Sequence, residues 1–213
     1  MKVCLVGPGD LDLHAQIYGI DKSKLEKVAE GIGRILAESG VEIVLLPDRG
    51  ISYRVAESYK KHNGKRVWCT VPLSDKVFHT DHLEPYRCIC DETINTGDWF
   101  RQDLTICLFG HCILCLGLSL GTVRDFTGGY YLYKLFKGKK PTVSVDIKKV
   151  HPQAVAGEIE PYTMILYMPL IKEKSLPPEM EDYIKAVGGE VRYVHDLNEL
   201  KSVLLELQSK ESK

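Results

Sequence analysis

Short apolar runs alternate along this chain with longer segments in which apolar residues recur every three or four positions. The runs have the length of buried strands, and the periodic segments are typical of amphipathic helices. Strands separated by helices pair in parallel, with helices on both faces of the sheet. We therefore expect a doubly wound, mainly parallel α/β sheet in a single domain, residues 1–213. The predicted strands are 2–7, 41–47, 66–72, 88–94, 111–116, 142–147, 163–169 and 190–194.

Helices are predicted where capping or stop signals bound the periodic segments. Ser23 and Glu26 form a capping-box pattern before a helix that ends at Gly40. Asp196 and Glu199 provide a cap for the last helix. The segments 8–20 and 73–87 have no clear helical period, and we expect loops there. The other predicted helices are 51–62, 96–110, 121–136 and 177–189.

Composition narrows the class of protein. Hydrophobic residues make up 44% and charged residues 27%, as in an ordinary soluble globular protein. The net charge of −1 gives no field that would steer the chain to nucleic acid or to a membrane. The apolar N-terminal run is broken by Gly-Pro-Gly-Asp, so it is too short for a secretion signal or a membrane span. We expect a cytoplasmic protein.

Seven cysteines raise the question of disulfides and metals. Their odd number, without a secretion signal, favours buried thiols over disulfides. Cys112 and Cys115 fall within one apolar strand, where a spacing of three sends the side chains to opposite faces and disfavours zinc. His79 and His82 lie in a polar segment and are the more credible metal or substrate contacts, a question that the sequence leaves open. We assign no metal and no cofactor.

Ligands of doubly wound sheets bind beyond the carboxyl ends of the strands, so the loops there are candidate sites. Gly7-Pro8-Gly9 follows the first strand, but Asp12 stands where a dinucleotide fingerprint requires a third glycine. An oxidoreductase that uses NAD is therefore disfavoured. Arg49 and Gly50 follow the second strand. Gly50 at a helix start exposes amides that can hold an anion, and Arg49 can add a charge-assisted contact.

A third loop, Ser119-Leu120-Gly121-Thr122, leads from the predicted central strand into a helix. Small residues there let backbone amides approach a phosphate or a ribose, and two side chains carry hydroxyl groups. Asp125 lies one turn further along, at the same mouth. The same residues would also serve as an ordinary helix cap with an acid near the positive end of the dipole.

Together these loops resemble the nucleotide-binding superfamily of the LOG phosphoribohydrolases, the "lysine decarboxylase-like" proteins and the molybdenum-cofactor carriers. Gly50-Ile51-Ser52-Tyr53-Arg54-Val55-Ala56 is similar to the superfamily's element after strand two. Arg101 falls where the superfamily has an arginine on the helix before the central strand. The stretch from Gly117 to Asp125 matches the spacing of its P-G-G-x-G-T-x-x-E motif, and the last strand and helix are also similar.

The resemblance implies a Rossmann-like fold, a homodimer and a nucleotide-type small molecule as ligand. If the reaction is retained, it implies cleavage of a nucleoside monophosphate to free base and ribose 5-phosphate. Asp125 would stabilise the oxocarbenium-like transition state and orient water, and Arg101 would contact the phosphate or the leaving base. Residues 119–122 would bind the 5′-phosphate.

Two departures from the motif keep two classes of function open. Leu118-Ser119 replaces the double glycine, and Asp125 replaces a glutamate that is longer by one methylene. Catalysis depends on placement to about one ångström or better. The chain is therefore expected to be either an N-glycosidase-type enzyme or a non-catalytic protein that carries or senses a nucleotide or a nucleotide-like cofactor.

Overall fold

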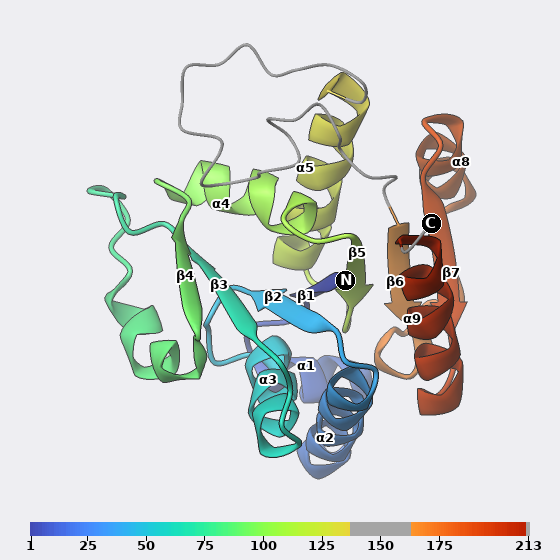
Figure 1. Ribbon diagram of the computed structural model, residues 1–213, viewed down its shortest axis with the longest axis horizontal. Helices are drawn as coiled ribbons and strands as arrows, with labels where there is room; N and C mark the ends of the chain where they lie inside the picture. The colour runs from blue at the N-terminus through green and yellow to red at the C-terminus, as the bar shows by residue number, and fades with distance from the viewer. Residues whose placement is uncertain (137–162, 212–213) are drawn as a thin grey trace.

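The computed structural model describes residues 1–136 and 163–211, which contain one sheet of seven parallel strands. The strands lie in the order β4-β3-β2-β1-β5-β6-β7 (Figure 1). This arrangement confirms the predicted doubly wound, parallel α/β fold. The predicted strand 142–147 lies outside the described residues. The strands are β1 (Lys2–Val6), β2 (Glu42–Leu45), β3 (Val67–Val71), β4 (Glu92–Asn95), β5 (Cys112–Cys115), β6 (Thr163–Tyr167) and β7 (Glu190–Val194).

The direction in which strands are added to the sheet reverses between β1 and β5. The chain moves outward from β1 through β2 and β3 to β4, and then places β5 on the other side of β1. Cys4 on β1 accordingly pairs with Val44 on β2 and with Ile113 on β5. The chain leaves β1 and β5 towards opposite faces of the sheet, and this topology leaves a crevice beyond the carboxyl ends of the two strands.

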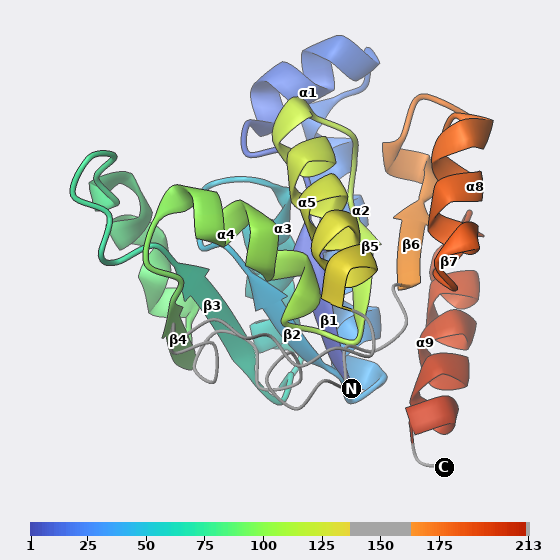
Figure 2. The same cartoon turned by 90° about the horizontal axis from the view of Figure 1, so that it is seen from above.

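Helices cover both faces of the sheet (Figures 1 and 2). Successive residues of β1 point to opposite faces, so that Val3 and Leu5 join the core under α1, α2, α3 and α9. Cys4 and Val6 join the core on the other face, under α4, α5 and α8. The helices are α1 (Leu11–Tyr18), α2 (Lys22–Glu38), α3 (Ile51–Lys61), α4 (Trp99–Thr105), α5 (Leu120–Phe136), α8 (Pro178–Ala186) and α9 (Leu197–Glu211).

The structure corrects three local predictions. The segment expected to be a loop after β1 contains α1, which Asp10 caps by accepting a hydrogen bond from the Leu13 amide at 3.0 Å. The cap of α2 is Asp21, whose carboxylate accepts from the Ser23 amide at 2.7 Å, so the predicted capping box was wrong. The strand expected at 88–94 begins only at Glu92, because the preceding residues form the 3₁₀ helix η1 (Asp81–Ile89).

The cysteines follow the prediction only in part. Cys69 on β3 and Cys90 after η1 form a disulfide with a Cα–Cα distance of 5.6 Å, so the expectation of no disulfide was wrong. Cys112 and Cys115 form no disulfide and are buried, in the cores on opposite faces of the sheet, as the strand period predicted. Cys4 and Cys107, which are buried, and Cys88, which is exposed, are also outside the disulfide.

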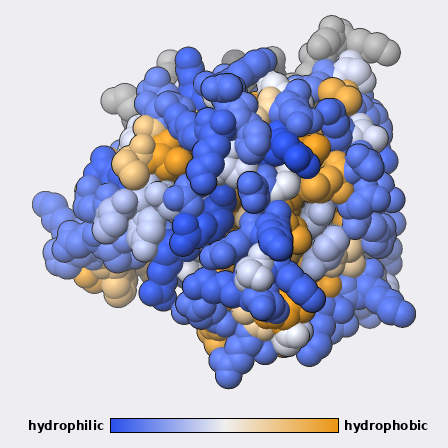
Figure 3. Space-filling view, turned by 90° about the horizontal axis from the view of Figure 1, so that it is seen from below, coloured by the Kyte–Doolittle hydropathy of each residue, from blue (hydrophilic) through white to orange (hydrophobic). Residues whose placement is uncertain are grey.

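Seen from the side of α2 and α3, the surface is mostly hydrophilic, with apolar residues in separated patches (Figure 3). The apolar stripe of α2 is turned inward, where Leu25, Ile32 and Leu36 are buried. Among residues 1–136 and 163–211, no helix combines the length and the apolar character that a membrane span requires.

Candidate functional site

A cavity of about 340 Å³ opens at the carboxyl ends of β1 and β2 and beside the first turn of α5. It lies at the reversal of strand order between β1 and β5, the place where this class of sheet binds ligands. Asp48 and Ser52 contribute to it from the β2 side, and Trp99 and Asp103 from α4. The predicted site residues that line it are Gly7, Pro8, Gly9, Gly50, Ser119, Gly121, Thr122 and Asp125.

The loops after β1 and β2 form one wall of the cavity by packing directly on each other. The Ile51 amide donates to the Pro8 carbonyl oxygen at 3.1 Å. A side-chain carbon on Gly50 would lie 2.3 Å from that same oxygen, so only glycine permits this contact. The first-turn amide of α3 is thus used within the protein. Gly50 has a structural reason to be glycine, whether or not a ligand also touches it.

The first turn of α5 forms the opposite wall. Ser119 caps the helix, since its hydroxyl oxygen accepts from the Thr122 amide at 3.1 Å and lies 2.9 Å from the Thr122 hydroxyl. The amides of Leu120 and Gly121 precede the first intrahelical hydrogen bond and have no helical partner. A side-chain carbon on Gly121 would meet nothing closer than the Ser119 hydroxyl, at 3.8 Å, so this backbone borders open space.

The turn between β5 and α5 depends on a second glycine. Gly117 has φ of +132°, a conformation that other residues rarely adopt. A side-chain carbon there would also lie 3.0 Å from both the His14 ring and the Pro8 ring. The turn that presents Ser119 is therefore held against the loop after β1 and against α1.

Three ionisable side chains gather on the α4 and α5 side of the cavity. The guanidinium Nε of Arg124 lies 2.8 Å from a carboxylate oxygen of Asp103, and Asp125 follows on the next position of α5. Burial raises the pKa of Asp125 to about 8, the charge of Asp103 adds to that rise, and Arg124 opposes it. Burial also raises the pKa of Asp103, again against the effect of Arg124. At pH 7 Asp125 is therefore mainly protonated, and it can donate a hydrogen bond.

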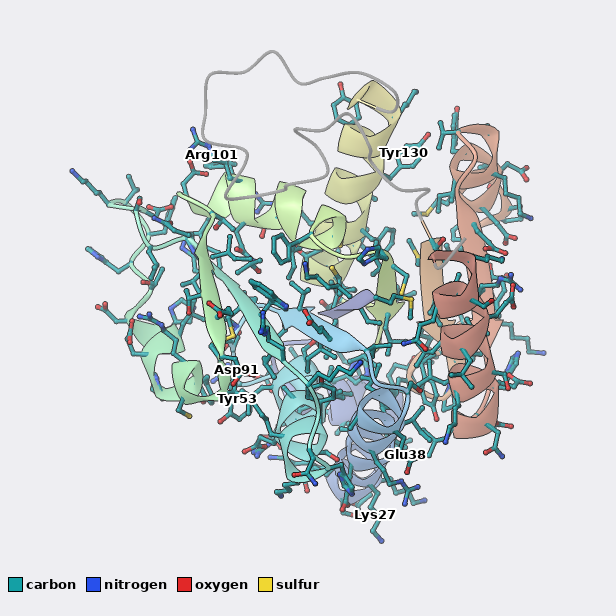
Figure 4. All side chains as sticks on the ribbon, in the orientation of Figure 1. Lys27, Glu38, Tyr53, Asp91, Arg101 and Tyr130 are labelled. Carbon is teal, nitrogen blue, oxygen red and sulfur yellow. A yellow bond between two sulfur atoms is a disulfide. The ribbon has the colours of Figure 1, made fainter. Side chains whose placement is uncertain are left out.

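Arg101, the arginine that the sequence assigned to catalysis, lies outside the described lining of this cavity. It projects from α4 away from the sheet (Figure 4). Its Nε lies 3.5 Å from the carboxylate of Asp98, the cap of α4, and its guanidinium folds back over Gly97. The arginine that lines the cavity is Arg124, which stands inside the motif that the sequence analysis quoted.

Arg49 and Leu120 are also outside the described lining. The Arg49 guanidinium lies 3.3 Å from the carboxylate of Asp10, the residue that caps α1. The Leu120 side chain is 91% exposed, so its contribution to the site is its backbone amide. Asp103 was missed from the sequence, although its spacing of four from Trp99 places both residues on one face of α4.

The histidines and cysteines form no metal centre in the described part of the chain, where no group of three or more His, Cys, Asp or Glu side chains could hold an ion. The His82 ring stacks on Trp99, with ring centres 5.6 Å apart and planes 15° apart. Trp99 lines the cavity, so His82 supports its wall from behind. His79 is exposed on the neighbouring loop.

No protein-family model matches the chain, and no curated protein sequence does either. Solved structures match its fold over nearly the whole length. The molybdenum cofactor carrier protein of Chlamydomonas reinhardtii aligns with a TM-score of 0.57 and 16% identity over 98% of both chains. The molybdenum cofactor binding protein of Rippkaea orientalis gives 0.54 and 14%, over 100% of this chain and 97% of that one.

The protein TM1055 aligns with a TM-score of 0.60 and 15% identity, over 96% of this chain and 98% of its own. Such low identities establish the fold and nothing finer. The Rossmann-like fold that the sequence resemblance implied is thereby confirmed.

Proposed function

We propose that this chain binds a phosphorylated, nucleoside-type small molecule in the cavity between the loop after β1 and the first turn of α5. The observation that carries the proposal is the position of this turn, which borders an open cavity at the reversal of strand order. The fold shared with proteins described as molybdenum cofactor carrier and binding proteins supports a ligand of this class. The resemblance also supports a homodimer.

The phosphate would sit at the start of α5. The Leu120 and Gly121 amides belong to the N-terminus of α5, the positive end of the helix dipole, where anions bind favourably. Arg124 supplies a full positive charge at the same cavity, and no side chain on Gly121 blocks the approach. The half-buried acids, Asp103 and Asp125, then lie on the side of the cavity where the sugar and the base would extend.

A hydrolytic role is favoured by two acids at one cavity, Asp125, whose pKa burial raises to about 8, and Asp103, which is paired with Arg124. The protonated Asp125 would donate its proton to the leaving base as the bond from C1′ to nitrogen breaks. Asp103, paired with Arg124, would accept a proton from the water whose oxygen bonds to C1′. The products would be the free base and ribose 5-phosphate. The position of Arg101 outside the described lining favours the alternative, a carrier or sensor that binds without cleavage.

Two substitutions at Ser119 test the binding site without removing the helix cap. Asparagine and aspartate both cap helices well, so Ser119→Asn and Ser119→Asp should fold alike. Calorimetric titration with AMP, GMP and ribose 5-phosphate should detect binding to the wild type and to Ser119→Asn. Ser119→Asp adds a negative charge where the phosphate sits and should weaken binding at least about tenfold, the effect of a 1.4 kcal/mol repulsion. Equal affinities of the two variants, or no binding of any probe to the wild type, would refute the proposal.

Chromatography of the same mixtures after incubation separates the two functions. Release of free base by the wild type, and its loss in Asp125→Asn, would establish hydrolysis. Tight binding with no base released would establish a carrier or sensor. Sedimentation of the wild type at several concentrations tests the homodimer.

A further inference from the structure

A second cavity, of about 310 Å³, adjoins the first between α4 and α5. Asp103 and Arg124 line both cavities, so the two spaces meet at this ion pair. Phe100 contributes to the second cavity from α4, and Tyr131 contributes from α5. Nothing in the phosphate-binding role of the first cavity accounts for this extension.

The side chains that face the second cavity form one stripe on each helix. Arg124, Thr127, Gly128 and Tyr131 are spaced by three and four residues along α5, which places them on one face. Phe100 and Asp103 have the same relation on α4. Phe100 is 65% exposed and Tyr131 is 57% exposed. A single exposed aromatic is ordinary, but two that line one cavity provide flat apolar surfaces on which a planar ring can stack.

Gly128 offers a physical reason for the shape of this cavity. Glycine disfavours the interior of a helix, because it adds backbone freedom to the unfolded chain and packs no side chain. At this position it leaves bare backbone on the stripe between Arg124 and Tyr131. A ligand ring could therefore lie closer to the backbone of α5 than it could if residue 128 carried a side chain.

The polar groups stand where such a ring would have its edge. Asp103 can accept hydrogen bonds, and Arg124, whose guanidinium carbon lies 5.6 Å from the centre of the Phe100 ring, can donate them. The Thr127 hydroxyl donates to the Val123 carbonyl at 2.7 Å, which leaves its oxygen as an acceptor. Donors and acceptors beside aromatic surfaces match a planar nitrogen heterocycle better than an aliphatic group.

We propose that the second cavity binds the planar nitrogen heterocycle of the same ligand whose phosphate lies at the start of α5. The inference rests on the proposed function and adds where the ring of that ligand binds and which side chains hold it. The Asp103–Arg124 pair then lies between phosphate and ring, beside the sugar or linker. A nucleobase and a pterin share the chemistry that this subsite recognises, and separate probes distinguish them.

Calorimetric titration of the wild type with AMP, with a phosphorylated neopterin and with ribose 5-phosphate tests the subsite. At least one ring-bearing probe should bind about tenfold more tightly than ribose 5-phosphate, as stacking on aromatic side chains implies. The preferred ring identifies the source. Phe100→Ala and Tyr131→Ala should each remove most of this advantage and leave the affinity for ribose 5-phosphate unchanged. Tyr131→Phe, which keeps the ring, should retain it.

Tyr183→Ala is the matched control, because Tyr183 is 64% exposed on α8 and lies in neither cavity lining. Ring-bearing probes that bind no better than ribose 5-phosphate, or alanine variants with unchanged affinities, would overturn the inference while leaving the phosphate site intact. Failure of all three probes to bind would overturn the proposed function, and this inference with it. If Tyr131→Ala instead dissociates a dimer and leaves every affinity unchanged, the cavity is an interface between copies and the inference is wrong.

Discussion

Arg124 on α5 and Asp103 on α4 form an ion pair, with Nε 2.8 Å from the carboxylate oxygen, at the boundary between the two cavities. The Asp103 side chain is 18% exposed and the Arg124 side chain is 56% exposed, so the carboxylate is largely buried and the guanidinium is exposed to solvent. The pair joins two helices that pack on the same face of the sheet. It also sets the charge that the neighbouring Asp125 experiences.

Asp103→Asn should lower the pKa of Asp125 below about 8. The substitution removes a negative charge that favours the protonated form and releases Arg124 to interact with Asp125 alone. Burial, the largest cause of the raised pKa, remains, so the value should stay above the ordinary one. A titration of the carboxyl carbons by NMR, with Asp125→Asn to assign the signal, measures the shift. Asp182→Asn, on exposed α8, is the control and should leave the signal unchanged.

The raised pKa of Asp125 predicts that ionisation of this side chain lowers the free energy of unfolding as pH rises. The folded value is about 8 and the reference value is 3.8, so between them the folded state holds a proton that the unfolded state has lost. The stabilisation linked to that proton is complete below about pH 4 and disappears as pH rises through about 8. Asp125→Asn carries no charge at any pH and should escape this loss.

Urea unfolding of the wild type and of Asp125→Asn at pH 5 and pH 9 measures the effect. The variant should gain stability relative to the wild type by on the order of 1–3 kcal/mol on going from pH 5 to pH 9. This range is smaller than full linkage would give, because the side chain is not fully buried and solvent screens part of its charge. Glu179→Gln on α8 should show no such difference. A constant gap between variant and wild type would contradict the prediction.

The sequence predicted the sheet well, because its buried strands are short apolar runs and its long helices have a clear period. The sequence prediction failed where an element is short or where its structure depends on residues far away in the chain. The eight-residue helix α1 has too few turns for a period, although Asp10 and Gly19 cap its two ends. The run from Cys88 to Cys90 has the composition of a strand, but it forms the end of η1 and a disulfide with Cys69.

The sheet topology predicted where the candidate site lies, but not every side chain that lines it. The loops after β1 and β5 had to meet because parallel strands end at one edge, and the structure places Ser119, Gly121 and Asp125 together with Gly7. Which arginine faces the cavity depends on how α4 and α5 pack. No spacing within one helix specifies that Arg124 meets Asp103 while Arg101 folds back on its own cap.

The disulfide between Cys69 and Cys90 should stabilise the fold measurably. It closes a loop with a sequence separation of 21 residues, for which loss of chain entropy in the unfolded state implies about 3 kcal/mol. Urea unfolding with and without a reducing agent should differ by about this amount in the wild type. The Cys69→Ala, Cys90→Ala double variant should be insensitive to the reductant and less stable than the oxidised wild type by about the same amount. An unfolding free energy of the wild type that does not change on full reduction of the disulfide would contradict the prediction.

Gly50 and Gly121 both line the cavity, but alanine should affect them in opposite ways. At Gly50 the added carbon would lie 2.3 Å from the Pro8 carbonyl and 2.6 Å from Gly9, and backbone cannot easily move. We expect Gly50→Ala to cost about 2–4 kcal/mol of unfolding free energy, as steric conflicts in packed sites do.

The added methyl group of Gly121→Ala meets open space, so this variant should be neutral or slightly stabilising, because alanine favours helices. Its methyl group would nevertheless enter the proposed phosphate site and weaken binding of ribose 5-phosphate. Chemical unfolding and calorimetry of both variants separate the two effects, and a Gly50→Ala protein as stable as the wild type would show that the loops after β1 and β2 do not pack as described.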